Sequence, residues 1–168
     1  TSVVYGAIFG SILSSLRSVK TSLIVFDTEV VDFTDQLSDP VELLFGTQLG
    51  GGTDIHKALT YAEKLVVSPS DTILVLITDL YEGGSESALI RRAASIKALG
   101  VQFVTLLALN DEGAPSYDRS VAAVFHDMDI PTFACTPDRF PALMSAAIKR
   151  EDLGQFDSFG NGFFNHDV

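Results

Sequence analysis

The chain is poor in cysteine, poor in basic residues and free of long apolar runs. Cys135 is the only cysteine among 168 residues, so the chain cannot form an internal disulfide. No motif of paired Cys and His ligands surrounds it. A reducing, cytoplasmic setting is therefore the default expectation, with Cys135 as a small buried apolar residue near the end of a strand.

Basic residues are half as numerous as acidic ones. The sequence has 11 Lys and Arg against 22 Asp and Glu, which gives a formal net charge of -11. Nonspecific binding to nucleic acid depends on Lys and Arg side chains that displace counterions from phosphates. We therefore expect no nucleic-acid partner, and cations or basic protein surfaces fit this charge better.

No apolar run reaches the ~18 residues that a membrane-spanning helix needs, so we expect no membrane partner. The N-terminus has no basic leader, no cleavage signature and no initiator Met, as in a processed or truncated piece. Gly-x-Gly-x-x-Gly, Walker and Gly-x-Ser-x-Gly patterns are also missing, which leaves nucleotide binding and the serine-hydrolase class without support.

The composition is that of a packed globular protein, with 46% hydrophobic and 20% charged residues. A chain of this length removes roughly 70% of its unfolded surface from water, so we expect one domain over residues 1–150. Residues 151–168 form a tail rich in Phe and Gly. Several phenylalanines in a disordered tail would be unusual, and we expect the tail to pack on this domain or on a partner.

The hydrophobic periodicity alternates between strand and helix. It predicts helices over 3–17, 53–66, 85–99, 117–126 and 138–149, a short apolar turn over 41–45, and strands over 23–26, 30–33, 72–77, 101–109 and 130–135. The first two strands form an antiparallel hairpin, the continuous run 72–77 is typical of a central strand, and 130–135 is an edge strand. The expected fold is α/β, a doubly wound three-layer α/β/α arrangement with a mostly parallel sheet.

Two residues at element ends are candidate metal ligands. Thr53 closes the loop Gly50-Gly51-Gly52 before a predicted helix, and Asp79 follows the predicted strand 26 residues later. A hydroxyl and a carboxylate are the oxygen donors that Mg²⁺ prefers. A turn with a helix cap at Thr53 or Asp54 explains the same residues, and spacing alone does not separate the two interpretations.

The order of these motifs resembles the von Willebrand factor A (VWA) family. The resemblance depends on Phe26-Asp27-Thr28 in the hairpin, Gly51-Gly52-Thr53-Asp54 with Ala58-Leu59 soon after, and Leu76-Ile77-Thr78-Asp79. It covers roughly residues 1–150 and is closest to a bacterial intracellular branch whose members often work beside MoxR-type AAA+ ATPases.

The resemblance implies a metal-ion-dependent adhesion site (MIDAS) at the C-terminal ends of the strands. In such a site a partner's Asp or Glu completes the shell of a Mg²⁺ or Mn²⁺ ion. Thr53 would bind the ion through its hydroxyl, and Asp79 would hold it directly or through water. The implied function is a protein-interaction module and not an enzyme.

One part of the family pattern is missing. The family's first metal motif, Asp-x-Ser-x-Ser after the first central strand, does not occur in this chain. Ser2, Ser11 and Ser14 do not replace it, because none follows a strand or has an Asp two residues before it. We therefore expect weak metal binding, and we expect the strand to lie upstream of Thr1 rather than to be replaced by another segment.

Two other functions remain open from the sequence. Residues 23–30 also resemble the nucleophile strand of haloacid dehalogenase-type phosphatases, with Asp27 attacking phosphorus and Glu29 as the acid. A hairpin turn explains Asp27 better, because no downstream acidic pair or phosphate-binding Lys is evident. The second alternative is a metal-free scaffold with a vestigial site.

Three kinds of polar residue also have structural interpretations. Glu82 would either tune the metal or supply a favourable charge at a helix N-terminus, and we favour the second. Asp54 would cap a helix or orient the ligands of the ion. The histidines lack the spacing of metal ligands: His56, His126 and His166.

Overall fold

The computed structural model describes residues 19–36, 52–108, 114 and 116–157. Several predictions of the sequence analysis fall outside these residues: the helix over 3–17, the apolar turn over 41–45, and the part of the tail beyond residue 157.

The hairpin forms as predicted. Strand β1 (Ile24–Phe26) pairs antiparallel with β2 (Val30–Asp32), and Phe26 lies opposite Val30. The turn is closed by two hydrogen bonds: Asp27 N donates to Glu29 O at 3.0 Å, and Glu29 N donates to Asp27 Oδ1 at 2.6 Å. A short 3-10 helix, η1 (Thr34–Gln36), follows β2.

The remaining described strands form a parallel sheet in the order β3-β4-β5. They span Ile73–Thr78 (β3), Gln102–Leu107 (β4) and Thr132–Phe133 (β5). Each pairs in parallel with its neighbour, so that Leu76 lies opposite Thr105 and Thr105 opposite Thr132. The mostly parallel α/β fold with one antiparallel pair is confirmed, and β5 is the edge strand that the sequence predicted.

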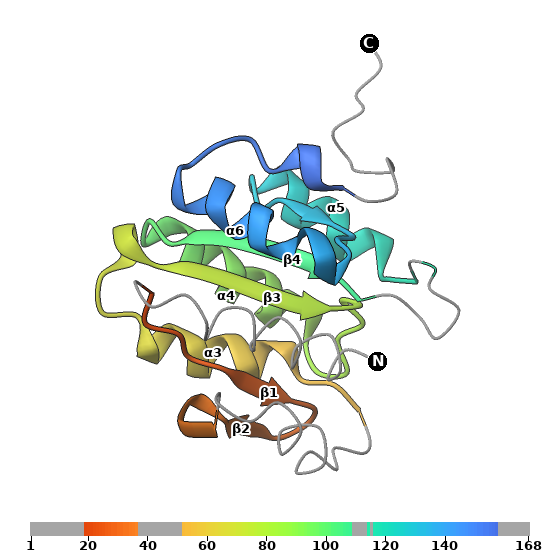
Figure 1. Ribbon diagram of the computed structural model, residues 1–168. Coiled ribbons are helices and arrows are strands. Elements are labelled where there is room, and N and C mark those ends of the chain that lie inside the picture. Colours follow the sequence, from red (N-terminus) through yellow and green to blue (C-terminus); the bar gives the residue numbers. More distant parts are fainter. Residues whose placement is uncertain (1–18, 37–51, 109–113, 115, 158–168) are drawn as a thin grey trace.

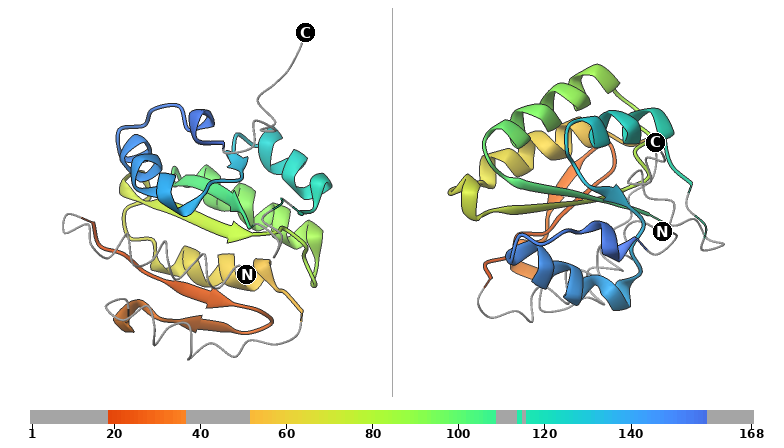
Figure 2. Two further views of the ribbon diagram at one scale, coloured as in Figure 1. Left: turned by 45° about the vertical axis from the view of Figure 1, so that its right-hand side comes forward. Right: turned by 90° about the horizontal axis from the view of Figure 1, so that it is seen from above.

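Helices cover both faces of this sheet and give three layers (Figure 2). One face carries α3 (Ile55–Leu65), α4 (Glu86–Ala98) and α5 (Arg119–Asp127), and the other carries α6 (Phe140–Ile148). Short 3-10 helices precede or follow these elements: η2 (Pro69–Asp71), η3 (Pro137–Arg139) and η4 (Gly154–Phe156).

Helix ends match the local sequence signals. Ser85 caps α4, because its hydroxyl accepts a 3.2 Å hydrogen bond from Ala88 N. Gly100, with φ of +97°, lies just beyond the same helix in the left-handed conformation that glycine adopts without a steric penalty. Asp118 caps α5 through hydrogen bonds from Ser120 N and Val121 N.

The core is divided by the sheet. One cluster of buried apolar residues joins β3 and β4 to α3, α4 and α5, and a second joins the opposite face to α6. Leu153 and Phe156 belong to the second cluster, so the first residues of the Phe-rich tail pack on this domain as predicted. Arg139 holds them in place, since its Nη2 donates to Gln155 O at 2.8 Å and its guanidinium lies 5.5 Å from the Phe156 ring centre.

Strand β3 differs from its prediction as a central strand covered on both faces. Only Leu76 and Thr78 of its six residues are buried, whereas five of six are buried in β4. The reason is pairing: among the described strands, β3 pairs with β4 alone, and none lies between β3 and the hairpin (Figure 1). The missing first strand itself stays a prediction.

Candidate metal centre

The N-terminus of α3 and the C-terminus of β3 meet at one end of the sheet. Thr53 lies two residues before α3, and Asp79 directly follows β3. The loop after Asp79 returns to Thr53, because Gly83 N donates a 2.7 Å hydrogen bond to Thr53 O. The structure thus brings the two predicted ligand-bearing segments to the same edge.

Both side chains have oxygen atoms available for a cation. Thr53 and Asp79 are half-buried. Within the described residues the Thr53 hydroxyl makes no hydrogen bond, and the Asp79 carboxylate accepts one, from Tyr81 N to Oδ1 at 3.2 Å. The Asp79 backbone is fixed by a 2.9 Å hydrogen bond from Asp118 N to its carbonyl oxygen. A hydroxyl and a carboxylate oxygen are hard donors that fit Mg²⁺.

These two donors form only part of a metal site. Over the residues that the structure describes, no group of three or more His, Cys, Asp or Glu side chains could hold a metal ion. Mg²⁺ requires a near-octahedral shell of oxygen atoms. Thr53 and Asp79 would therefore need ligands from elsewhere for tight binding.

Asp54 is the helix cap, which decides between the two residues that the sequence left open. Its Oδ1 accepts a 2.8 Å hydrogen bond from Lys57 N in the first turn of α3. Its own amide donates to Asp27 O at 2.7 Å. Because Asp54 satisfies the helix end, the Thr53 hydroxyl is not needed for capping.

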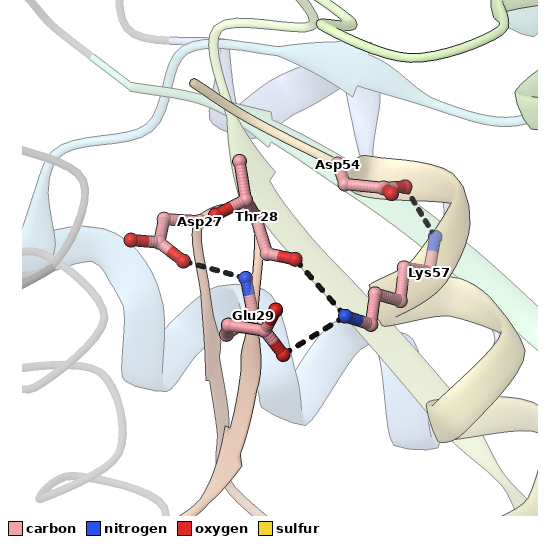
Figure 3. Close-up of polar contacts among 5 residues, drawn as sticks. All are labelled: Asp27, Thr28, Glu29, Asp54 and Lys57. Carbon is pink, nitrogen blue, oxygen red and sulfur yellow. Dashed lines mark hydrogen bonds and ion pairs between the residues drawn. The ribbon is translucent and has the colours of Figure 1, made fainter. Parts of the chain in front are cut away.

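Lys57 joins α3 to the tip of the hairpin (Figure 3). Its Nζ donates to Thr28 O at 3.1 Å and to Glu29 Oε2 at 2.9 Å. Asp54 lies on the same side, one turn earlier on the helix. The hairpin turn is thereby fixed against the loop that carries Thr53.

The same contacts define the role of Asp27. Its Oδ1 closes the hairpin turn on Glu29 N, while the Glu29 carboxylate pairs with Lys57. Asp27 is thus a turn residue, as the hairpin interpretation predicted. The strand before it leads into an antiparallel partner, and the described residues offer no acidic cluster that would accompany a phosphatase nucleophile.

Glu82 supplies the helix-terminal charge that the sequence favoured, and it does so at the N-terminus of α3. Its Oε2 accepts a 2.9 Å hydrogen bond from His56 N in the first turn of α3, and its Oε1 accepts one of 2.9 Å from Gly84 N. A carboxylate at a helix N-terminus is favoured by the helix dipole.

Leu80 shows how firmly the loop after β3 is held. Its side chain is fully buried in the core, and its backbone has a φ of +65°. Such a conformation costs a bulky residue on the order of 1–3 kcal/mol and persists only where the surroundings enforce it. Here the enforcing contacts are the buried side chain and a 3.1 Å hydrogen bond from Leu80 N to Thr78 Oγ1.

The remaining candidates are Cys135 and the histidines. Cys135 is 3% exposed just after β5, and desolvation raises the pKa of its thiol to about 11, which leaves it unreactive at neutral pH. His56 and His126 belong to no metal-binding group of described residues, and His166 lies outside them.

Comparison with known proteins agrees with the sequence and the fold. The family described as VWA domain containing CoxE-like protein matches residues 1–144. The chain belongs to this family. The VWA resemblance is therefore confirmed, and the α/β fold agrees with it.

A curated relative is the uncharacterized protein YehP of Escherichia coli (strain K12). It is 38% identical over 136 residues, which is 81% of this chain and 36% of YehP. The chain therefore corresponds to about a third of that relative. No solved structure matches the chain. Within the described part of this VWA protein, no helix is both long and apolar enough to span a membrane.

Proposed function

We propose that this VWA domain is a Mg²⁺-dependent protein-interaction module that binds an Asp or Glu of a partner protein. The observation that carries the proposal is the junction of Thr53 and Asp79, whose segments are joined by the hydrogen bond from Gly83 N to Thr53 O. Open α/β sheets bind ligands at the C-terminal ends of their strands, where this junction lies. Membership of the VWA family supports an interaction module in general.

The two residues have distinct roles in this proposal. The Thr53 hydroxyl binds the ion directly, and the Asp79 carboxylate binds it directly or through a water molecule. A carboxylate of the partner occupies a remaining position. The ion supplies the positive charge that this edge needs, because the carboxylates of Asp54, Asp79 and Glu82 would otherwise repel an acidic partner.

The other ligands come from outside the described residues. We place them on a strand that pairs with the open edge of β3 and runs parallel to it. Such a strand would end beside Thr78, next to Asp79, because parallel strands end at the same edge of a sheet. Its pairing would also satisfy backbone groups of β3 that now have no partner strand among the described residues.

The partner is a protein, and a MoxR-type AAA+ ATPase system is the specific candidate that the family resemblance offers. Because the chain spans 36% of YehP, the proposal concerns this domain alone. A non-catalytic role and a cytoplasmic location are part of the same proposal. The competing function is a metal-free scaffold, which would bind its partner equally well in the presence of a chelator.

Calorimetric titration of Mn²⁺ and Mg²⁺ into the chain tests the proposal. Thr53→Ala and Asp79→Ala remove the two donors. Asp127→Ala is the control, because it removes an exposed acidic side chain at the C-terminal end of α5, away from the candidate metal centre. Saturable binding that survives in Asp127→Ala and disappears in the other two variants supports the metal site. No binding to the unaltered chain would favour the metal-free scaffold.

A further inference from the structure

The loop over residues 79–84 connects β3 to α4, yet its hydrogen bonds tie it to α3. Gly83 N donates to Thr53 O at 2.7 Å, and Glu82 Oε2 accepts from His56 N at 2.9 Å. A third bond, from Gly84 N to Glu82 Oε1, holds the Glu82 side chain in the orientation that reaches the helix. We call residues 79–84 the clamp loop.

Position 83 requires glycine, because the backbone of Thr53, in the loop before α3, lies against it. A Cβ atom at this position would lie 2.6 Å from Thr53 O, closer than real Cβ atoms approach, and 3.2 Å from Thr53 N. At the neighbouring Gly84 the nearest atom to such a Cβ is Glu82 Oε1 at 3.4 Å, an ordinary contact with a movable side chain. The two glycines are adjacent, but only Gly83 has no room for a methyl group.

Glu82 completes the capping of α3 from a distance. The first amides of a helix have no partner within the helix. Asp54 accepts from Lys57 N, and Glu82 accepts from His56 N. The start of α3 is therefore held by one local carboxylate and by one from the clamp loop, 26 residues from His56.

The other end of the clamp loop is anchored in the core. Leu80 is fully buried with a positive φ, and Asp79 O accepts a hydrogen bond from Asp118 N at the start of α5. The Asp79 backbone therefore cannot shift without disturbing the packing of Leu80. Through Glu82 and Gly83, the same loop fixes the backbone of Thr53.

We propose that Glu82 and Gly83 are positioning residues that set the separation of the Thr53 hydroxyl and the Asp79 carboxylate before a cation binds. This inference rests on the proposed metal function. Neither residue contacts the ion, but groups that orient ligands commonly change metal affinity by roughly 10-fold to 100-fold when they are removed. The clamp loop supplies this preorganisation to a pair of donors that is weak by itself.

Matched variants test the inference. Gly83→Ala forces the Thr53 carbonyl away, whereas Gly84→Ala adds the same methyl group one residue later without a clash. Glu82→Gln weakens the hold on α3, whereas Glu63→Gln weakens a different tertiary contact of the same helix, the ion pair with Arg92 on α4. Urea unfolding of each variant separates loss of stability from loss of metal affinity.

The expected result is a loss of Mn²⁺ affinity of roughly 10-fold or more in Gly83→Ala and Glu82→Gln. Glu63→Gln should bind Mn²⁺ like the unaltered chain, even where it loses as much stability, and Gly84→Ala, which keeps the amide that holds Glu82, should lose less affinity than Gly83→Ala. Unchanged affinity in both Gly83→Ala and Glu82→Gln would overturn the inference, as would an equal loss in the controls. Absence of Mn²⁺ binding to the unaltered chain would instead count against the proposed metal function of residues 1–168 by themselves.

Amide hydrogen exchange on the metal-free chain tests the same clamp without any ion. Glu82→Gln should speed exchange at the Gly83 amide, and Gly83→Ala should speed exchange at the His56 amide. Neither substitution removes the donor or the acceptor of the hydrogen bond whose exchange is measured. Faster exchange therefore shows that the two hydrogen bonds act as one unit. Exchange rates that change in neither variant would show that the clamp loop does not hold Thr53 and Asp79 together.

Discussion

The amide of Asp54 donates a 2.7 Å hydrogen bond to the carbonyl oxygen of Asp27, which ties the start of α3 to the tip of the β1–β2 hairpin. Thr28 Cγ2 lies 3.6 Å from the position of a Cβ at Gly52, so the same turn also lies against the loop before Thr53. The clamp loop holds Thr53 from the other side. The candidate metal centre is thus built on a loop fixed by two separate parts of the chain.

Lys57→Met should destabilise the hairpin contact only slightly. The Lys57 and Glu29 side chains are 46% and 75% exposed, and such surface pairs contribute about 0.2–1 kcal/mol. Urea unfolding of Lys57→Met, Glu29→Gln and the double variant measures the coupling of the pair. Lys64→Met, on an exposed Lys of the same helix, is the control. A coupling of several kcal/mol would show that the hairpin tip is held far more tightly than this exposure allows.

Leu80→Ala should be strongly destabilising. The side chain is fully buried, and removal of a buried Leu typically costs about 2–5 kcal/mol. Leu65→Ala serves for comparison, because Leu65 is 39% exposed and should cost much less. Equal losses of unfolding free energy in urea would contradict the anchoring role that we assign to Leu80.

Phe156→Ala should destabilise the domain even though Phe156 lies beyond the part that matches the family. Its ring is 9% exposed and packs with α6 and Arg139, so we expect a cost of about 3 kcal/mol in unfolding free energy. Gln155→Ala, at a neighbouring exposed side chain, should change stability by about 0.5 kcal/mol or less. A similarly small effect for Phe156→Ala would mean that this part of the tail does not belong to the core.

Asp118 should make stability depend on pH in the acidic range. The Ser120 hydroxyl, helped by the amides of Val121 and Ser120, lowers the pKa of Asp118 below its ordinary value of 3.8 despite partial burial. A carboxyl whose pKa is lower in the folded state stabilises the protein above its unfolded pKa, and that contribution is lost as pH falls through the folded pKa. Asp118→Asn should therefore be less stable than the unaltered chain at pH 7, and the difference should shrink below about pH 3.8. Urea unfolding across pH 7 to 3 measures it, and a constant difference would contradict this role.

Local signals predicted those features whose partners are close in sequence. The turn at Asp27 and the end of α4 at Gly100 depend on contacts within a few residues, and both formed as expected. Glu82 acting on α3, and Lys57 acting on the hairpin, depend on how distant elements pack. Local sequence patterns contain no sign of contacts between such distant residues. The contacts that support the candidate site therefore could not be predicted from the sequence.

Strand β3 illustrates a different limit. Its apolar, β-branched sequence predicts full burial, yet Ile73, Val75 and Ile77 are half-buried. An apolar strand sequence is typical of a strand with neighbours on both sides, whereas the described residues supply β3 with a partner strand on one side only. The pattern therefore indicated a neighbour that the described strands do not provide.

The most direct test of the metal centre is to locate a bound ion by nuclear magnetic resonance. Mn²⁺ broadens the amide signals of residues near it, and excess Mg²⁺ should reverse the effect by competition. We predict that the signals of Thr53, Asp54, Asp79 and Leu80 broaden first and recover with Mg²⁺. Broadening centred on the exposed acids Asp127 and Asp129, or spread evenly over the chain, would contradict a metal centre at Thr53 and Asp79.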